Sequence, residues 1–180
     1  MDMTKKRIAV FDLDGSLVRT DEANSAAYEY ALARIGIQGV CGLYGRITAD
    51  TIREAGLDDG DVDGVVKAKV DAYCSELWRS RLGPAATALH CVLLNRDMVD
   101  KVVLLTQSAE RRAMETLRYY GLEGCFDEIV CNVGQGNKYD NYFKTFDSDP
   151  AACVVWENEE GQIMSAIAAG VKPENIRKVS

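Results

Sequence analysis

The chain has 180 residues, 47% of them hydrophobic and 27% charged, so it can bury a core of its own and is neither disordered nor multi-modular. Acidic residues outnumber basic ones by 28 to 21, and the net charge of −7 excludes a basic surface for nucleic acid or an anionic membrane. The single histidine, His90, excludes a histidine-rich metal site, and the six cysteines lack paired zinc spacing.

The N-terminal residues lead into a strand-like run instead of an apolar signal sequence, and no stretch of ~18 apolar residues occurs. We therefore expect a soluble, cytoplasmic protein with reduced thiols, no membrane partner and no nucleic-acid partner. The sequence does not indicate an oligomeric state.

Short β-branched runs alternate with segments of helical period, which is typical of a parallel sheet covered by helices. We expect strands at residues 7–12, 101–106, 127–131 and 152–157, and an edge strand within 175–180. Helices are expected at residues 109–120, 139–145 and 162–169. Gly121 and Gly170 suit the C-terminal caps of the first and last of these helices.

The middle of the chain contains no convincing strand. Apolar residues recur with helical period in two segments, which predicts amphipathic helices around residues 23–31 and 66–77. In the first segment the expected apolar face consists of Ala23, Ala27, Tyr30 and Ala31. The predicted fold class is therefore α/β: a doubly wound, Rossmann-like parallel sheet core of residues 1–17 and 92–180, with a helical cap domain inserted at 18–91.

Two aspartates end the first predicted strand in the run Phe11-Asp12-Leu13-Asp14-Gly15-Ser16. The two-residue period of a strand aims Asp12 and Asp14 to the same side, at the carboxyl edge where open parallel sheets bind ligands. Two neighbouring carboxylates repel each other unless they share a proton or a cation, and Mg²⁺ is the usual cation. The alternative is a turn that merely closes the strand.

The other predicted strands also end in polar side chains. Thr106 closes the second strand and Ser108 can cap the following helix, an arrangement that binds phosphate or simply caps the helix. Lys138 opens a later helix, where an ammonium would neutralise phosphoryl oxygens; Lys144 is a rival, and a solvated lysine is the alternative.

The last predicted core strand runs into Glu157, Asn158 and Glu159, which offer oxygen ligands for a metal or form a plain acidic turn.

In their order along the chain these motifs resemble the haloacid dehalogenase (HAD) superfamily of phosphatases and phosphomutases, specifically its helical-cap, β-phosphoglucomutase-like subgroup. The resemblance covers nearly the whole chain. It implies that Asp12 is the nucleophile that forms an aspartyl-phosphate and that Asp14 is the general acid and base. It further implies that Thr106 and Lys138 hold the transferring phosphoryl group.

The resemblance implies a Mg²⁺-dependent phosphatase acting on a small phosphorylated metabolite, with Asp12, Asp14, Glu157 and Asn158 as metal ligands. In the predicted cap, Arg46 lies near the family's substrate-specificity loop and is a candidate substrate contact, as is Ser108 in the core.

The chain departs from the family pattern at Asn158, where an aspartate is common, and at Arg19, where an acidic residue is common. An amide supplies no charge to a metal, so Glu157 or Glu159 would compensate. The alternative function is a catalytically weak HAD-like protein that binds metal, phosphate or a protein partner.

Overall fold

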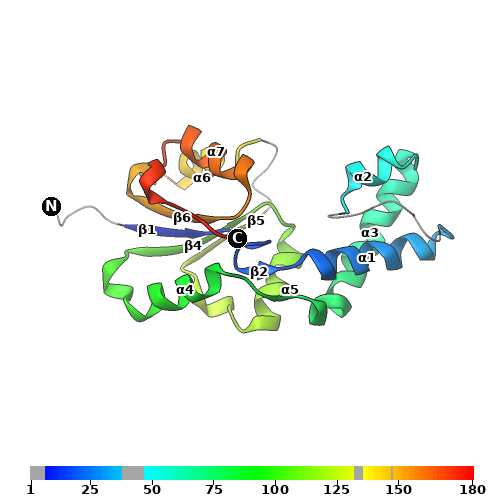
Figure 1. Ribbon diagram of the computed structural model, residues 1–180, viewed down its shortest axis with the longest axis horizontal. Coiled ribbons are helices and arrows are strands. Elements are labelled where there is room, and N and C mark those ends of the chain that lie inside the picture. The colour runs from blue at the N-terminus through cyan, green and yellow to red at the C-terminus, as the bar shows by residue number, and fades with distance from the viewer. Residues whose placement is uncertain (1–6, 38–46, 132–135, 147) are drawn as a thin grey trace. The chain divides into compact units, whose positions relative to one another are not determined.

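A five-stranded parallel sheet forms the centre of the larger part of the chain (Figure 1). The computed structural model describes residues 7–37, 47–131, 136–146 and 148–180. The strand order is β5-β4-β1-β6-β7, with β1 at Ile8–Phe11, β4 at Lys101–Thr106, β5 at Glu128–Cys131, β6 at Cys153–Glu157 and β7 at Ile176–Lys178. The predicted parallel α/β architecture is confirmed, including the edge strand at the C-terminal end.

Successive strand residues face opposite sides of the sheet, and helices cover both sides (Figure 1). Val10, Val103 and Val155 pack in the apolar cluster with side chains of α6 (Lys138–Phe146) and α7 (Glu160–Ala168). Phe11 and Leu104 pack on the other side with side chains of α4 (Ala85–Leu94) and α5 (Glu110–Tyr120). The sheet is therefore doubly wound, and its strands are apolar on both faces.

The chain divides into two compact units. The first comprises the residues up to Arg19 together with Leu82–Ser180, and the second is Thr20–Arg81. The second unit is helical, with α1 at Asp21–Arg34, α2 at Ala49–Glu54 and α3 at Asp59–Glu76. Its apolar residues form a core of their own that includes Tyr28, Ile52 and Val62.

The remaining elements are short. β2 (Val18–Arg19) and β3 (Arg81–Leu82) form a two-stranded sheet where the chain passes from one unit to the other and back. Single turns of 3₁₀ helix lie at Leu77–Arg79, Arg96–Met98, Glu123–Cys125, Pro150–Ala152 and Pro173–Asn175.

The boundary of the insertion differs from the predicted residues 18–91. The second unit ends at Arg81, and α4 belongs to the first unit because Ala85 and Leu89 are buried against β1 and β4. An apolar helix that covers a sheet has the same period as one that packs in a helical cap, so the pattern did not separate them.

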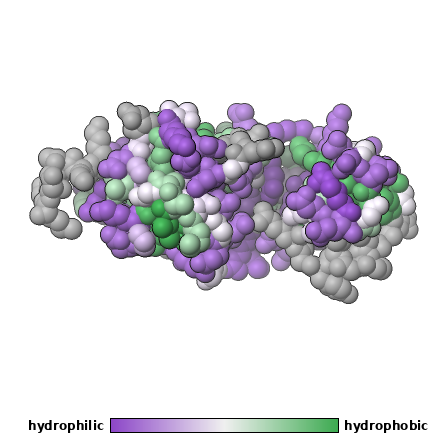
Figure 2. Space-filling model, turned by 90° about the horizontal axis from the view of Figure 1, so that it is seen from above, coloured by the Kyte–Doolittle hydropathy of each residue, from purple (hydrophilic) through white to green (hydrophobic). Residues whose placement is uncertain are grey.

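The surface of the described residues is predominantly hydrophilic on the side shown in Figure 2, with hydrophobic residues gathered in smaller areas. This agrees with the acidic composition of the chain. None of the described helices combines the length and the apolar character that a membrane span requires.

Candidate active site

Asp12 follows β1 directly, at the carboxyl edge of the sheet. Phe11 is paired with Leu104 of β4 and with Trp156 of β6, so the residues that follow these partners converge at the same edge. The backbone N–H of Asp12 donates to the Trp156 carbonyl at 3.1 Å, which fixes the start of the loop after β1. The sequence therefore carries Asp12, Thr106 and Glu157 to one end of the sheet.

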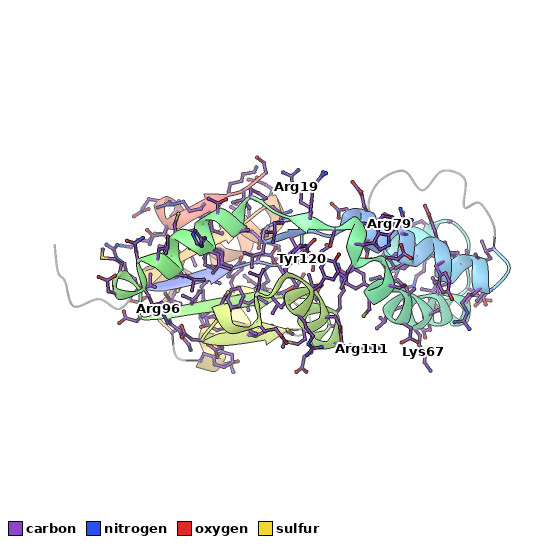
Figure 3. The ribbon with its side chains drawn as sticks, turned by 90° about the horizontal axis from the view of Figure 1, so that it is seen from below. Arg19, Lys67, Arg79, Arg96, Arg111 and Tyr120 are labelled. Atoms are coloured by element: carbon purple, nitrogen blue, oxygen red, sulfur yellow. The ribbon has the colours of Figure 1, made fainter. Side chains whose placement is uncertain are left out.

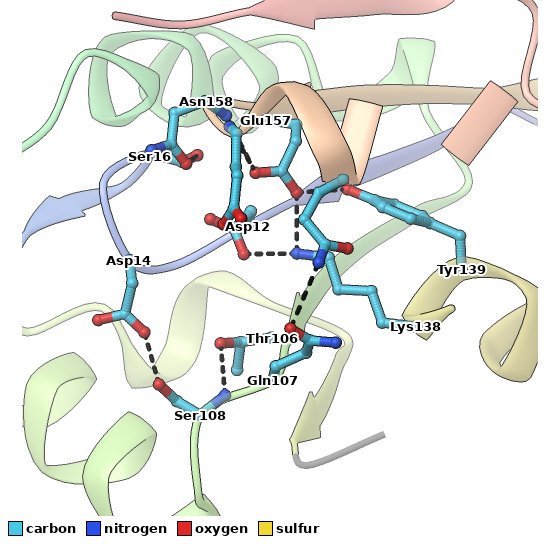
Figure 4. Close-up of polar contacts among 12 residues, drawn as sticks. Asp12, Asp14, Ser16, Thr106, Gln107, Ser108, Lys138, Tyr139, Glu157 and Asn158 are labelled. Carbon is cyan, nitrogen blue, oxygen red and sulfur yellow. Dashed lines mark hydrogen bonds and ion pairs between the residues drawn. The ribbon is translucent and has the colours of Figure 1, made fainter. Parts of the chain in front are cut away.

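Lys138 joins two of these groups in a buried cluster (Figure 4). Its Nζ atom lies 2.7 Å from Asp12 Oδ1 and 2.8 Å from Glu157 Oε2. The side chains of Lys138, Asp12 and Glu157 are 3%, 8% and 1% exposed, so water screens these charges little. Two carboxylates and one ammonium leave an excess of negative charge, which a cation would relieve.

Glu157 is held by further donors. The phenol of Tyr139 donates to Glu157 Oε2 at 2.8 Å, and the backbone N–H groups of Asn158 and Glu159 donate to Oε1 at 3.0 and 3.2 Å. Burial and the charge of Glu157 raise the pKa of Tyr139 well above its ordinary value, so this phenol stays protonated and acts as a donor. Glu157 is thus a fixed anion that orients Lys138.

Burial dominates the electrostatics of Asp12. It raises the pKa of Asp12 to about 7, against the opposing pull of Lys138 and with a contribution from the charge of Glu157. Burial also opposes the charge on Lys138, but Asp12 and Glu157 outweigh it, and the pKa of Lys138 is raised. A cation beside Asp12 would hold it in the ionised form that a nucleophile needs.

Asp14 is directed to a different set of partners. Ser108 Oγ donates to Asp14 Oδ2 at 2.5 Å, and Arg112 Nη2 donates to Asp14 Oδ1 at 2.5 Å (Figure 4 shows the Ser108 contact). Both the Arg112 and the Asp14 side chains are 15% exposed. Arg112 was not predicted from the sequence, because a helical arginine reveals its direction only once the helix is packed.

Thr106 and Ser108 form the turn between β4 and α5. The Ser108 backbone N–H donates to Thr106 Oγ1 at 3.1 Å, so the two predicted residues share one local motif. Thr106 is 1% exposed and ends a strand that is buried from its second residue onward. The Ser108 hydroxyl donates to Asp14 in this structure, so its predicted contact with a substrate stays a prediction.

Asn158 packs against the loop that follows β1. One end of its carboxamide lies 3.1 Å from the Asp14 carbonyl oxygen, 3.0 Å from Ser16 Oγ and 3.2 Å from Glu157 Oε1. With nitrogen at this end the amide donates to these oxygens, and with oxygen there it accepts from Ser16 Oγ. Gly15 has a φ of +83°, and a Cβ at this position would lie 2.3 Å from the amide, so glycine is required.

The oxygens near Asp12 suit a hard cation. Within the described ranges no three His, Cys, Asp or Glu side chains form a metal cluster. A metal at this edge would therefore combine a carboxylate with amide and backbone oxygens, which Mg²⁺ accepts. The Asp12 carboxylate, the Asp14 carbonyl and the Asn158 amide are of these types, and the excess buried charge favours the cation.

The other predicted candidates lie apart from this cluster or cannot be placed. Lys144 pairs with Asp140 at 2.6 Å and its side chain is 72% exposed, so it does not replace Lys138. Glu159 is exposed and contributes its backbone N–H to Glu157. Arg46 lies outside the described residues.

No protein-family model matches this chain, and a search of curated proteins found no match. Similar solved structures include a haloacid dehalogenase-like hydrolase from Streptococcus pneumoniae, with a TM-score of 0.72 and 16% identity over 94% of this chain and 83% of that one. CbbY from Rhodobacter sphaeroides, in complex with phosphate, has a TM-score of 0.71 and 19% identity over 93% of this chain and 84% of that one. The chain has the haloacid dehalogenase fold.

A third structure with this fold is a HAD-superfamily hydrolase of subfamily IA from Geobacter sulfurreducens, with a TM-score of 0.67 and 17% identity over 93% of this chain and 85% of that one. The neighbours from Streptococcus pneumoniae and Geobacter sulfurreducens are named as hydrolases, and the chain spans most of the length of all three structures. The resemblance of fold that the motifs predicted is thus confirmed.

Proposed function

We propose that this HAD-fold protein is a phosphatase that hydrolyses a small phosphorylated metabolite through a phosphorylated Asp12. The buried cluster of Asp12, Lys138 and Glu157 at the carboxyl edge of the sheet carries the proposal. An ammonium 2.7 Å from a buried carboxylate both orients that carboxylate and offers positive charge to an incoming phosphoryl group. Hydrolase names among the structural neighbours support it further.

In the proposed reaction an Asp12 oxygen attacks phosphorus, and the bond from phosphorus to the leaving oxygen breaks as Asp14 gives that oxygen a proton. Water then attacks the phosphorus of the aspartyl-phosphate while Asp14 takes a proton from it. Phosphate leaves and the Asp12 carboxylate is restored. Lys138 and Thr106 hold the phosphoryl oxygens in both steps.

We propose Mg²⁺ as the cofactor, since HAD-fold phosphatases generally use it. The Asp12 carboxylate, the Asp14 carbonyl and the Asn158 amide oxygen would hold the ion, which would offset phosphoryl charge. Glu157 has both carboxylate oxygens engaged by Lys138, Tyr139 and two backbone N–H groups. We therefore assign Glu157 to the orientation of Lys138 in place of the metal-ligand role predicted from the sequence.

The inserted unit Thr20–Arg81 is proposed to select the substrate, with Arg46 as a contact. A buried anionic cluster beside a phosphate-binding turn suits a small phosphomonoester better than a polyanion, because the chain carries a net charge of −7. A cytoplasmic location, where Mg²⁺ and phosphorylated metabolites are plentiful, belongs to the same proposal.

Turnover of p-nitrophenyl phosphate with added Mg²⁺ tests the proposal. Asp12→Asn should lower kcat by three orders of magnitude or more, about 4 kcal/mol, with an unchanged circular dichroism spectrum. Asp140→Asn, which makes the same change at a carboxylate that is 43% exposed and pairs with Lys144 instead of Lys138, is the control. A folded Asp12→Asn protein with normal turnover would refute the assignment.

Binding of phosphate or metal without turnover is a second candidate function, favoured by the neutral amide of Asn158. The wild-type protein would then bind inorganic phosphate in the presence of Mg²⁺ by calorimetry, yet release none from a panel of phosphomonoesters. Phosphate release that Asp12→Asn abolishes would decide for the phosphatase.

A further inference from the structure

Arg112 links α5 to the loop that follows β1. Its Nη2 atom lies 2.5 Å from Asp14 Oδ1, and the Ser108 hydroxyl occupies the other Asp14 oxygen at the same distance. Both oxygens of this carboxylate are therefore engaged by donors from one structural region, the start of α5 and the turn before it. The side chains of Arg112 and Asp14 are each only 15% exposed, and this burial strengthens the charge-assisted hydrogen bond between them.

The helix that carries Arg112 is a rigid support. Ala113 and Leu117 of α5 are fully buried against the apolar face of β1 and β4, and Gly121 ends the helix with a φ of +67°. Neighbouring Arg111 is exposed and extends from the outer side of α5 (Figure 3). Burial of Ala113 and Leu117 thus fixes which of two consecutive arginines meets Asp14.

The loop that carries Asp14 needs such a support. It follows the end of β1 with Gly15 in a positive-φ conformation, and the backbone of Asp14 forms an isolated bridge to Val18 instead of belonging to a strand. A proton donor on a loop is effective only when its carboxylate is held close to the productive position.

We propose that Arg112 is a positioning residue that fixes the carboxylate of Asp14 for proton transfer. The inference rests on the proposed function, in which Asp14 protonates the leaving oxygen and then activates water. Arg112 acts through Asp14, so its removal should impair the steps that use Asp14 and leave substrate binding nearly intact.

Arg112→Met, which removes the charge and keeps much of the volume, is the informative variant, and Arg111→Met is its matched control. With phenyl phosphate, whose leaving phenolate is basic, Arg112→Met should lower kcat by about 10–100-fold and change KM by less than about 3-fold. The leaving group of p-nitrophenyl phosphate needs little protonation. With this substrate Arg112→Met should therefore slow the formation of the phosphorylated enzyme less than it does with phenyl phosphate. Arg112→Lys should recover part of the loss, and Arg111→Met should behave as wild type.

Arg112→Met in an Asp14→Asn background distinguishes an effect of Arg112 through Asp14 from an effect that is independent of Asp14. Because Arg112 acts through Asp14, Arg112→Met should slow the Asp14→Asn protein by no more than about 2-fold. Equal losses in both backgrounds would overturn the positioning role while Asp12→Asn still supports the phosphatase. Retained turnover in Asp12→Asn would overturn the proposed function, and the catalytic role of Arg112 with it.

Discussion

Asn158→Asp tests the electrostatics of the site directly. In the metal-free protein it adds a third carboxylate, with one oxygen about 3.2 Å from Glu157 Oε1. Two unit charges at that distance repel by about 5 kcal/mol at an effective dielectric of about 20. The new carboxyl can avoid this repulsion by taking up a proton. Protonating an aspartate with an ordinary pKa of about 3.9 at pH 7 costs about 4 kcal/mol, which is therefore the upper limit of the destabilisation. We expect the metal-free variant to lose about 2–4 kcal/mol of unfolding free energy at pH 7.

The pH dependence of this loss has a fixed sign. The new carboxyl has a raised pKa in the folded protein, so the loss is small near pH 4 and grows as pH rises toward the folded-state pKa. Urea denaturation of chelator-treated protein at pH 5 and pH 7.5 measures it. Mg²⁺ should reverse the loss, and calorimetry should show Mg²⁺ binding tightened by about tenfold, or about 1.4 kcal/mol.

Asn95→Asp makes the same chemical change at the exposed C-terminal end of α4, where the amide donates to the Cys91 carbonyl at 2.8 Å. It is the control for the effect of Mg²⁺, because Mg²⁺ should not reverse its loss of stability. Unchanged stability of metal-free Asn158→Asp at pH 7.5 would refute the proximity of this amide to Glu157. If neither Asn158→Asp, Glu157→Gln nor Glu159→Gln alters Mg²⁺ binding, the end of β6 does not contribute to the metal site.

Three further changes probe the buried cluster. Asp12→Asn should stabilise the metal-free protein by about 1–3 kcal/mol at pH 8, because Asp12 has a pKa raised to about 7; the gain should vanish toward pH 4 in urea titrations. Lys138→Met should cost about 3–5 kcal/mol at pH 7 by thermal denaturation, since it leaves two buried carboxylates unpaired, and less near pH 5. Tyr139→Phe should cost about 1–2 kcal/mol and leave circular dichroism unchanged; full stability would mean that its hydrogen bond to Glu157 contributes nothing.

Much of the fold was predictable because parallel strands buried on both faces are continuous apolar runs. Lys101–Thr106 has the predicted bounds, and Cys153–Glu157 begins one residue later than expected. The first helix of the insertion shows where periodicity falls short. Ala23 and Ala27 are buried as predicted, but Tyr30 is 52% exposed and Tyr28 is buried in its place. The two tyrosines lie about 200° apart around the helix, and the row of alanines does not reveal on which of its sides the buried face extends.

The site divides in the same way. Topology alone predicts that Asp12, Thr106 and Glu157 meet, because each ends a parallel strand at one edge of the sheet. Tyr139 and Arg112 come from helices, where direction depends on packing that single residues do not reveal. The placement of Lys138 between two carboxylates required the helix start to be fixed by Asn137, which accepts from the Tyr139 N–H at 2.9 Å.

The central claim is that Asp12 carries the phosphoryl group. Rapid acid quench of the enzyme during turnover of p-nitrophenyl phosphate, followed by intact-protein mass and peptide mapping, measures this directly. We predict one added phosphoryl group in the peptide that contains Asp12, more of it in Asp14→Asn and none in Asp12→Asn. Turnover without any phosphorylated enzyme in the wild type and in Asp14→Asn would contradict the account, and so would a phosphoryl group on another residue.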